Sequence, residues 1–360
     1  MAESLPDNTS RLIGKIASYT LRKPMTLMEV CGTHTHAIFA TGARSLMPEN
    51  LKIISGPGCP VCVTDQEDID KMVALSEIPN LALCTFGDML KVQGTKSSLA
   101  LSKSKGFDVR IMYSPFDVIG WSQKEQRKTF VLVGIGFETT TPGFAATIIE
   151  AKKRGIKNIL HLCLHKTVPN ALEALAQSTE VKVDGLILPG HVSAIIGVKP
   201  YQFLADRYSI PGVVIGFEGE DILVGVEMLT EMIASGKPGI KNQYTRVVKD
   251  DGNIKAREIV SAVFEDCDAS WRGLGVIPMS GLKHKKEYET FDVLNHFKIN
   301  VGYSKEADGC ICGKVIIGAK TPNQCPLFER VCTPSNPVGP CMVSGEGTCS
   351  AYFKYNRMNQ

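Results

Sequence analysis

The chain has 360 residues, of which 44% are hydrophobic and 21% charged, and its formal net charge is +3 at pH 7. This composition is typical of a folded globular protein, and the length predicts two or three domains. No basic run alternates with aromatic residues, and no apolar run reaches the ~18 residues that span a membrane, so we expect neither nucleic acid nor membranes as partners.

The N-terminal stretch, residues 1–24, lacks the long apolar segment and the small-residue cleavage site of a signal peptide. We therefore expect a cytoplasmic protein, and we predict that this stretch is a helical segment. From about residue 25 to 235, short apolar runs alternate with helix signals. Runs this continuous are typical of strands that are covered on both faces in a parallel sheet. The predicted strands are Leu51–Ile54, Leu81–Thr85, Val109–Met112, Phe130–Val133, Ile159–Leu162, Gly185–Leu188 and Val213–Ile215.

Helix signals lie between these strands. Thr64 and Glu67 form a capping-box pattern before a predicted helix at Asp65–Leu75. Thr141 precedes a proline at the first helical position of a second helix, which we expect to end before Gly155. Strands that alternate with helices predict an α/β fold.

A polar stretch, Trp121–Lys128, separates the predicted strands into two groups. We therefore predict two small α/β domains with mostly parallel sheets, residues 25–125 and residues 126–250. After Asp308, glycine, proline and cysteine become frequent and regular periodicity fades. We predict a third, cysteine-rich domain over residues 251–360 that is held together by something other than a large apolar core.

Twelve cysteines in a chain without an export signal favour metal binding or redox chemistry, because the cytosol keeps thiols reduced. Two groups of cysteines stand out. The front group is Cys31, Cys59 and Cys62, and the C-terminal group is Cys310, Cys312, Cys325, Cys332, Cys341 and Cys349.

In the front group, Cys31 is followed by His34 and His36, so one short loop offers soft and borderline metal ligands. The histidines have a plainer alternative, which is to satisfy local backbone groups. Cys59 and Cys62 form a Cys-x-x-Cys motif just before a predicted helix, where free backbone N–H groups stabilise a thiolate. Such a pair is a redox dithiol or half of a metal site, and the local residues leave both open.

Ligand sites of open α/β sheets gather at the carboxyl ends of the strands. Asp88, Glu138 and His191 each stand in a glycine-containing loop at such a predicted end. They are candidate acid–base groups or partners that orient a ligand, although Asp88 is equally suited to capping a turn. Neither glycine-rich phosphate-binding motif is present, so these loops are poor phosphate sites.

The C-terminal group contains the spacing C-x14-C-x6-C-x16-C, with two further cysteines, Cys312 and Cys341, left over. Zinc ribbons use paired Cys-x-x-Cys motifs, and this segment has none. Four separated thiolates favour an iron–sulfur cluster over zinc, although spacing alone leaves zinc open. The candidate ligands are Cys310, Cys325, Cys332 and Cys349.

Taken together, these motifs resemble the HypD family of [NiFe]-hydrogenase maturation proteins, over about residues 10 to 355. The residues that carry the resemblance are Cys31–His36, Gly56–Cys62, Thr85–Met89, Gly136–Thr140 and the C-terminal cysteine pattern. Gln93 and Glu329 depart from the family pattern, which has proline and glycine there. Both lie between the key residues and bear on loop shape rather than chemistry.

The resemblance implies a scaffold on which Fe(CN)2CO, the iron fragment of the hydrogenase active site, is assembled for a hydrogenase large-subunit precursor. It implies that a HypC-like partner shares the iron and that a HypE-like partner donates cyanide. Cys31 takes the position of the iron-binding cysteine, and Cys59 and Cys62 that of a dithiol. The four C-terminal candidates take the positions of [4Fe-4S] ligands. The implied fold is two α/β domains with a cluster domain.

This reading is chemically coherent. A soft thiolate suits low-spin iron that carries cyanide and carbon monoxide, and a dithiol with a cluster supplies the electrons that cyanide attachment requires. Two other classes remain: a cluster-containing disulfide reductase that acts on another protein, and a zinc-stapled binding module without redox chemistry.

Overall fold

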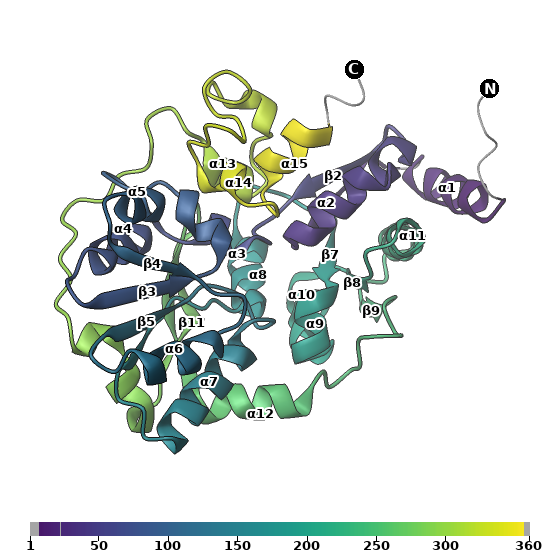
Figure 1. Cartoon of the computed structure of the whole chain (residues 1–360). Helices are drawn as coiled ribbons and strands as arrows, with labels where there is room; N and C mark the ends of the chain where they lie inside the picture. The colour runs from purple at the N-terminus through teal and green to yellow at the C-terminus, as the bar shows by residue number, and fades with distance from the viewer. Residues whose placement is uncertain (1–6, 22, 356–360) are drawn as a thin grey trace.

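Two parallel sheets organise the chain in the computed structural model, which describes residues 7–21 and 23–355 (Figure 1). Neighbouring strands in both sheets are parallel, as the sequence predicts. The first sheet has the order β2 (Leu51–Ser55), β1 (Met25–Glu29), β7 (Gly185–Pro189), β8 (Gly212–Ile215) and β9 (Ile240–Asn242). The second has the order β4 (Asp108–Ile111), β3 (Leu81–Thr85), β5 (Thr129–Gly134) and β6 (Ile159–Cys163).

All seven predicted strands are present, each within a residue of its predicted bounds. Two strands of these sheets, β1 and β9, were not predicted, and neither was a hairpin of two further strands at residues 264–284. In β1, Thr26 and Glu29 interrupt the apolar run, yet the strand lies between β2 and β7 and is buried along most of its length. The mostly parallel α/β fold is thus confirmed.

The strands are not divided between the sheets at residue 125, so this predicted boundary is wrong. The chain makes β1 and β2, crosses to build the whole second sheet over residues 81–163, and returns to complete the first sheet with β7, β8 and β9. The first sheet is therefore discontinuous in sequence. Strand order is a long-range property that no local pattern reports.

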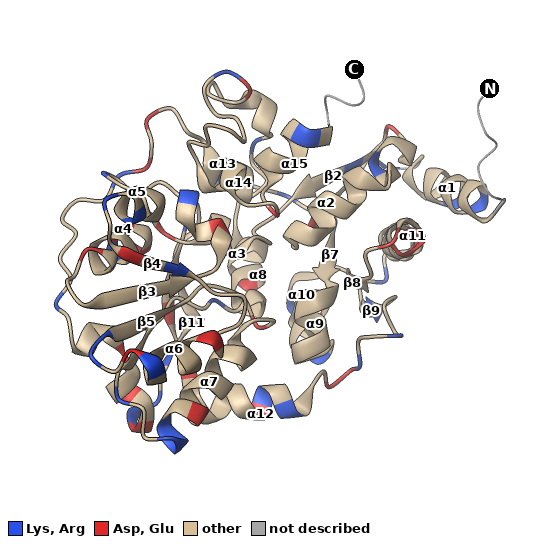
Figure 2. Ribbon diagram, in the orientation of Figure 1, with Lys and Arg blue, Asp and Glu red and all other residues tan. Residues whose placement is uncertain are grey.

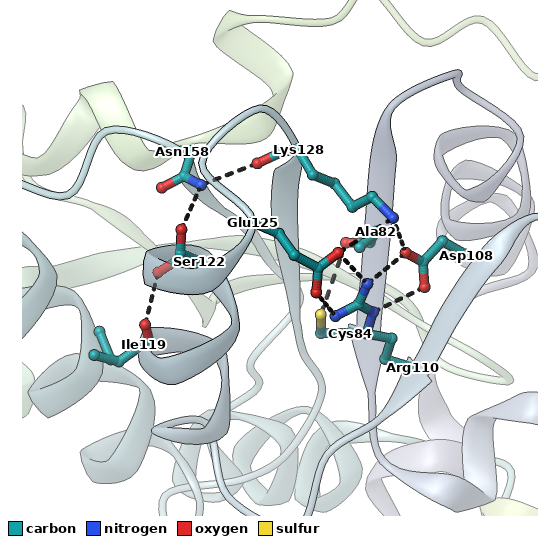
Figure 3. A network of polar contacts seen from close by, with 9 residues as sticks. All are labelled: Ala82, Cys84, Asp108, Arg110, Ile119, Ser122, Glu125, Lys128 and Asn158. Atoms are coloured by element: carbon teal, nitrogen blue, oxygen red, sulfur yellow. Dashed lines mark hydrogen bonds and ion pairs between the residues drawn. The ribbon is translucent and has the colours of Figure 1, made fainter.

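The polar stretch that suggested the boundary lies within the second sheet unit. It covers the end of α6 (Asp117–Lys124) and the loop into β5. Figure 3 shows why it is polar: Arg110 on the edge strand β4 is held between Asp108 and Glu125, with N–O distances of 2.7 Å to each, and Lys128 pairs with Asp108. The charges belong to an ion-pair network at a sheet edge, where such residues discourage pairing with another strand.

Helices cover both sheets, and charged residues gather on helices and loops such as α12, whereas most of the strands carry few (Figure 2). The predicted N-terminal helical segment is α1, although residues 1–6 and 22 lie outside the described residues. α1 packs against α11, and α12 contacts both α7 and α9, joining the two sheet units.

The helices are α1 (Asp7–Thr20), α2 (Gly32–Ala40), α3 (Pro60–Val63), α4 (Gln66–Ser76), α5 (Leu99–Ser104), α6 (Asp117–Lys124), α7 (Thr141–Lys153), α8 (Val168–Gln177), α9 (Gly190–Ile196), α10 (Gln202–Tyr208), α11 (Gly219–Ser235), α12 (Ile254–Val263), α13 (Cys312–Ile316), α14 (Pro340–Val343) and α15 (Thr348–Tyr355). The short 3-10 helices are η1 (Ala43–Leu46), η2 (Gly87–Lys91), η3 (Lys199–Tyr201), η4 (Lys286–Phe291), η5 (Val293–Asn295) and η6 (Pro322–Gln324).

One predicted helix start is confirmed and one is wrong. α7 begins at Thr141 and is followed by Gly155 at φ +67°, a conformation that favours glycine. The cap of α4 is Asp65, whose carboxylate accepts a hydrogen bond from the Glu67 N–H, so the predicted capping box does not form. The Thr64 hydroxyl instead donates to the Pro60 carbonyl.

The predicted C-terminal domain is two separate structures. Residues 251–284 form α12 and an antiparallel hairpin, β10 (Phe264–Trp271) and β11 (Gly275–His284), which packs against α8 and β6. Only residues 310–355, here called the cysteine lobe, gather the C-terminal thiols. In Figure 1 this lobe lies above both sheets; α13 and α14 contact α3, and α15 contacts α2.

Three fully buried histidines lie where the second sheet meets the hairpin. His161 Nδ1 lies 2.9 Å from His284 Nε2, while both ring nitrogens of His165 lack a hydrogen-bond partner among the described residues. A Cβ added at Gly134 would lie 2.3 Å from His161 Nε2 and 2.7 Å from His165 Nε2. Burial lowers the pKa of His165 to about 3 and also lowers those of His161 and His284.

These histidines make the fold sensitive to acid. Between pH 6.5 and about 3 the unfolded state binds protons at His165 that the folded state excludes, so stability falls as the pH drops below 6.5. We expect one such histidine to remove roughly 2 kcal/mol of unfolding free energy between pH 7.5 and pH 5. Urea unfolding at the two pH values measures it. His165→Leu should reduce the loss by about that amount, whereas the exposed His296→Gln should retain it. An unchanged pH dependence in His165→Leu would contradict this account.

Candidate functional site

Two loops at the carboxyl ends of β1 and β2 lie in direct contact. The Gly32 N–H donates to the Gly58 carbonyl at 3.0 Å, and the Gly56 N–H donates to the Glu29 carbonyl at 2.7 Å. A Cβ at Gly58 would lie 2.1 Å from the backbone nitrogen of Cys31. Only glycine permits this approach, and it brings Cys31 next to Cys59. We call these two loops, with the three thiols that they carry, the front site.

Cys31 is buried at the N-cap of α2, with 7% of its surface exposed. Its N–H donates to the Glu29 carboxylate at 3.0 Å. Burial, with smaller contributions from the nearby Glu346 and Glu29 carboxyls, raises the pKa of the Cys31 thiol to about 12. The thiol is therefore protonated at neutral pH in the free protein.

Glu29 is a buried residue of the front site that sequence reasoning did not select. Its second carboxylate oxygen accepts a hydrogen bond of 2.5 Å from the Thr35 hydroxyl, and burial raises the pKa of the carboxyl to about 8. A glutamate that ends a buried strand two residues before a candidate ligand was the available signal. Its contacts fix the start of α2, and with it the backbone of Cys31.

Cys59 and Cys62 form a disulfide across α3. Cys62 precedes α4, as predicted, but it lies inside a short helix that was not predicted, α3. Cys59 is the N-cap of α3, and its sulfur accepts a hydrogen bond from the Cys62 N–H at 3.2 Å. Both residues are buried. The convergence of all three front cysteines at neighbouring strand ends agrees with the expectation from the sheet topology.

A cavity of about 10 Å³, enough for about one water, lies between the front site and the cysteine lobe. Cys59 and Cys62 line one side of it, and Cys341 and Glu346 line the other. Glu346, a further residue that the sequence did not single out, accepts a hydrogen bond from the Thr33 hydroxyl. The disulfide therefore faces the lobe across a very small gap.

The candidate histidines do not face Cys31 with their rings. His34 Nε2 lies 3.0 Å from the Gly216 carbonyl and 3.1 Å from that of Ile215, so the ring ties α2 to the end of β8. His34 also stacks on Phe217, which stacks on the exposed His191. His36 is half-buried against Tyr355, at the end of the cysteine lobe. Burial lowers the pKa of His34 to about 4 and lowers those of His36 and His191.

The two candidate carboxylates are separated. Asp88, exposed on η2, acts electrostatically on Glu346 and so lies at the margin of the front site. Glu138 caps α8 by accepting a hydrogen bond from the Val168 N–H at 2.9 Å, and it lines a different cavity of about 520 Å³ beside α12. Burial raises the pKa of Glu138 to about 7. Its local role is structural, and the structure does not bring it to the front site.

The C-terminal thiols also converge. All six line one cavity of about 10 Å³, and hydrogen bonds join Cys310 to Cys312, Cys312 to Cys341, and Cys341 to Cys349. The two cysteines left over by the spacing therefore lie inside the group. Among the described residues, no three Cys, His, Asp or Glu side chains are arranged to hold a metal ion.

An all-thiol donor set fits an iron–sulfur cluster by its chemistry. The cavity admits about one water, so the thiols must move apart to hold a cluster. Residues Cys310, Cys325, Cys332 and Cys349 supply four ligands, and Cys312 is close enough to Cys310 to replace it.

The fold contains no membrane-spanning helix within residues 7–21 and 23–355: none is both long and apolar enough.

The model of a family described as "HypD: Hydrogenase formation hypA family" matches residues 7–356. The chain is 43% identical over 334 residues to a putative hydrogenase expression/formation protein of Methanocaldococcus jannaschii, with 93% of each chain covered. It is 41% identical over 358 residues to hydrogenase maturation factor HypD of Escherichia coli and 41% identical over 362 residues to that of Rhodobacter capsulatus. These two alignments cover 99% of this chain and 95% of each relative. On this similarity, which extends over nearly its whole length, the chain belongs to the HypD family.

Proposed function

We propose that this chain acts in hydrogenase maturation as a scaffold on which the Fe(CN)2CO fragment is assembled. The single observation that supports it most is that the Cys59–Cys62 pair and the cysteine lobe line one small cavity, while the Gly58 contact holds the backbone of Cys31 next to Cys59. A metal anchor, a two-electron thiol pair and a candidate cluster site are then neighbours. Family membership supports the same role.

In this proposal Cys31 is the iron anchor. Glu29 holds the backbone of Cys31 through the N–H hydrogen bond, and burial raises the pKa of its carboxyl to about 8. The N–H of His34 faces the Cys31 sulfur, whereas its ring fixes α2 to β8. His34 and His36 therefore shape the loop rather than bind the iron.

Cys59 and Cys62 supply two electrons and two protons when the dithiol closes to the disulfide. A [4Fe-4S] cluster in the lobe supplies single electrons when bound. Cys341 lies between the disulfide and the other lobe thiols, so the route from lobe to front site is short.

The partners in this proposal are a HypC-like protein that shares the iron, a HypE-like protein that donates cyanide, and, indirectly, a hydrogenase large-subunit precursor. The proposed scaffold acts in the cytoplasm. Asp88 and the η2 turn lie at the exposed margin of the front site, where a covering partner would make contact.

A disulfide reductase that acts on another protein is the second candidate, because the Cys59–Cys62 disulfide adjoins the cysteine lobe. It needs no mononuclear iron, so Cys31 would have no role in it. Infrared spectra of the protein purified with its HypC-like partner separate the two. Cyanide and carbonyl bands support the scaffold, and cluster absorption without them supports the reductase.

The first prediction from the site concerns the cluster. Anaerobically reconstituted protein should contain about four irons in the lobe, and Cys349→Ala should lose most of the cluster absorption, because four thiolates are needed. Cys84→Ala, which removes a buried thiol from β3 in the second sheet, should retain it. Full absorption in Cys349→Ala would show that the ligand set is wrong, with Cys341 the first replacement to test.

The second prediction distinguishes the role of Cys31 as iron ligand from the role of Cys59 and Cys62 as electron donors. Cys31→Ala should abolish the cyanide and carbonyl bands and leave the Cys59–Cys62 pair titratable, since the pair does not depend on iron. Cys62→Ala should retain non-cluster iron but block maturation. Loss of the iron itself in Cys62→Ala would instead make Cys59 and Cys62 direct iron ligands, and full-intensity bands in Cys31→Ala would remove Cys31 as anchor.

The third prediction concerns the partner surface. Asp88→Arg reverses a charge at the exposed margin of the front site, so we expect at least a tenfold weaker complex with the HypC-like partner, on the order of one lost charged contact. Asp206→Arg, on the exposed face of α10, is the matched control. Equal co-purification of both variants with the partner would exclude the η2 turn from the interface.

A further inference from the structure

Arg272, at the tip of the β10–β11 hairpin, is a buried cation that the proposed function leaves unused. Its side chain is only 2% exposed. The hairpin comes from beneath the second sheet, yet its tip reaches the junction of α3 and the cysteine lobe. A Cβ at Gly273 would lie 2.5 Å from the Gly313 carbonyl, next to Cys312.

Arg272 connects the end of α3 to the first residue of α4 and to Glu306. The Arg272 backbone N–H donates to the Val63 carbonyl at 2.9 Å, and Nε donates to the Thr64 carbonyl at 3.1 Å. One terminal nitrogen donates to Gln66 Oε1 at 3.1 Å, and the other pairs with Glu306 at 2.8 Å. Arg272 thus satisfies the free carbonyls at the carboxyl end of the four-residue helix that carries both thiols.

We propose that Arg272 is a positioning residue that holds α3 in one geometry in the oxidised and reduced states, so that Cys59 and Cys62 remain poised to re-form their disulfide. The inference rests on the dithiol role in the proposed function. A helix of four residues does not hold its shape in isolation. When the disulfide opens, the two thiols stay close only if both ends of α3 are fixed from outside.

The position of Arg272 and its positive charge predict opposite effects on the thiol–disulfide equilibrium of Cys59 and Cys62. A thiol pair held at bonding distance has a high effective concentration, which stabilises the disulfide. A cation near the pair stabilises the thiolate and therefore the reduced form. Glu306 pairs with the guanidinium at 2.8 Å and offsets its charge. We therefore expect the effect of Arg272 on the position of α3 to exceed the effect of its charge on the thiolates.

The test is a redox titration of the full-length, iron-free protein in dithiothreitol buffers. The protein S–S bond breaks, the dithiothreitol S–S bond forms, and two electrons and two protons pass to Cys59 and Cys62. Alkylation at these two residues, read by peptide mass, gives the equilibrium constant. We expect Arg272→Gln and Arg272→Lys to favour the dithiol by about three- to tenfold, since both lose the Nε hydrogen bond to the Thr64 carbonyl at the end of α3.

Arg110→Gln is the matched control, because Arg110 makes a comparable set of ion pairs on β4, in the second sheet (Figure 3). Arg110→Gln should lower the urea concentration at which half of the protein is unfolded. It should leave the thiol–disulfide equilibrium constant of Cys59 and Cys62 unchanged. A second readout is amide hydrogen exchange at residues 62–66 of the reduced protein, which should be faster in the Arg272 variants only.

Equilibrium constants of the Arg272 variants equal to that of the unsubstituted protein overturn the inference and leave the dithiol role standing. A shift toward the disulfide in Arg272→Gln overturns it in favour of the charge. A Cys59–Cys62 pair that does not titrate even in the unsubstituted protein removes the dithiol from the proposed function, and this inference with it.

Discussion

The backbone of residues 56–58 lies against that of residues 29–32, and this approach is possible because Gly58 has no side chain to meet the Cys31 nitrogen. The approach follows from the pairing of β1 with β2, in which Glu29 is level with Ser55. The backbone therefore leaves β1 and β2 at the same level of the sheet, and the loop after each strand brings Cys31 and Cys59 together. Backbone contacts between the two loops fix the geometry of the front site.

Burial then decides the chemistry that this geometry permits. With pKa values of about 12 for Cys31 and about 8 for Glu29, both groups are largely protonated at neutral pH in the free protein. A thiolate ligand must lose its proton when a metal binds, so the proposed capture of iron releases a proton inside a nearly dry site.

The sequence predicted what is local and missed what is distant. Continuous apolar runs identified seven strands, but they carried no information on sheet order, so the return of β7, β8 and β9 to β1 was not foreseen. The strand-end rule brought the front cysteines together correctly. The same rule made Glu138 a candidate site residue, although β5 belongs to the other sheet and Glu138 caps α8. Glu346 and Arg272 were missed because each acts through a contact that only the fold creates, whereas Glu29 carried a local signal that was not used.

The departure from the family pattern at Glu329 shows how the cysteine lobe tolerates change. Glu329 has φ +62°, a conformation that favours glycine, at a position where the resemblance implies glycine. Its N–H still donates to the Cys332 carbonyl at 3.2 Å, and the Cys332 N–H donates to Leu327 at 2.8 Å, so the turn that presents Cys332 is closed. A non-glycine residue in this region costs on the order of 1 kcal/mol, which a closed turn within a packed lobe absorbs. The chemistry of the lobe depends on where its turns place the thiols, and this turn holds its shape without the glycine.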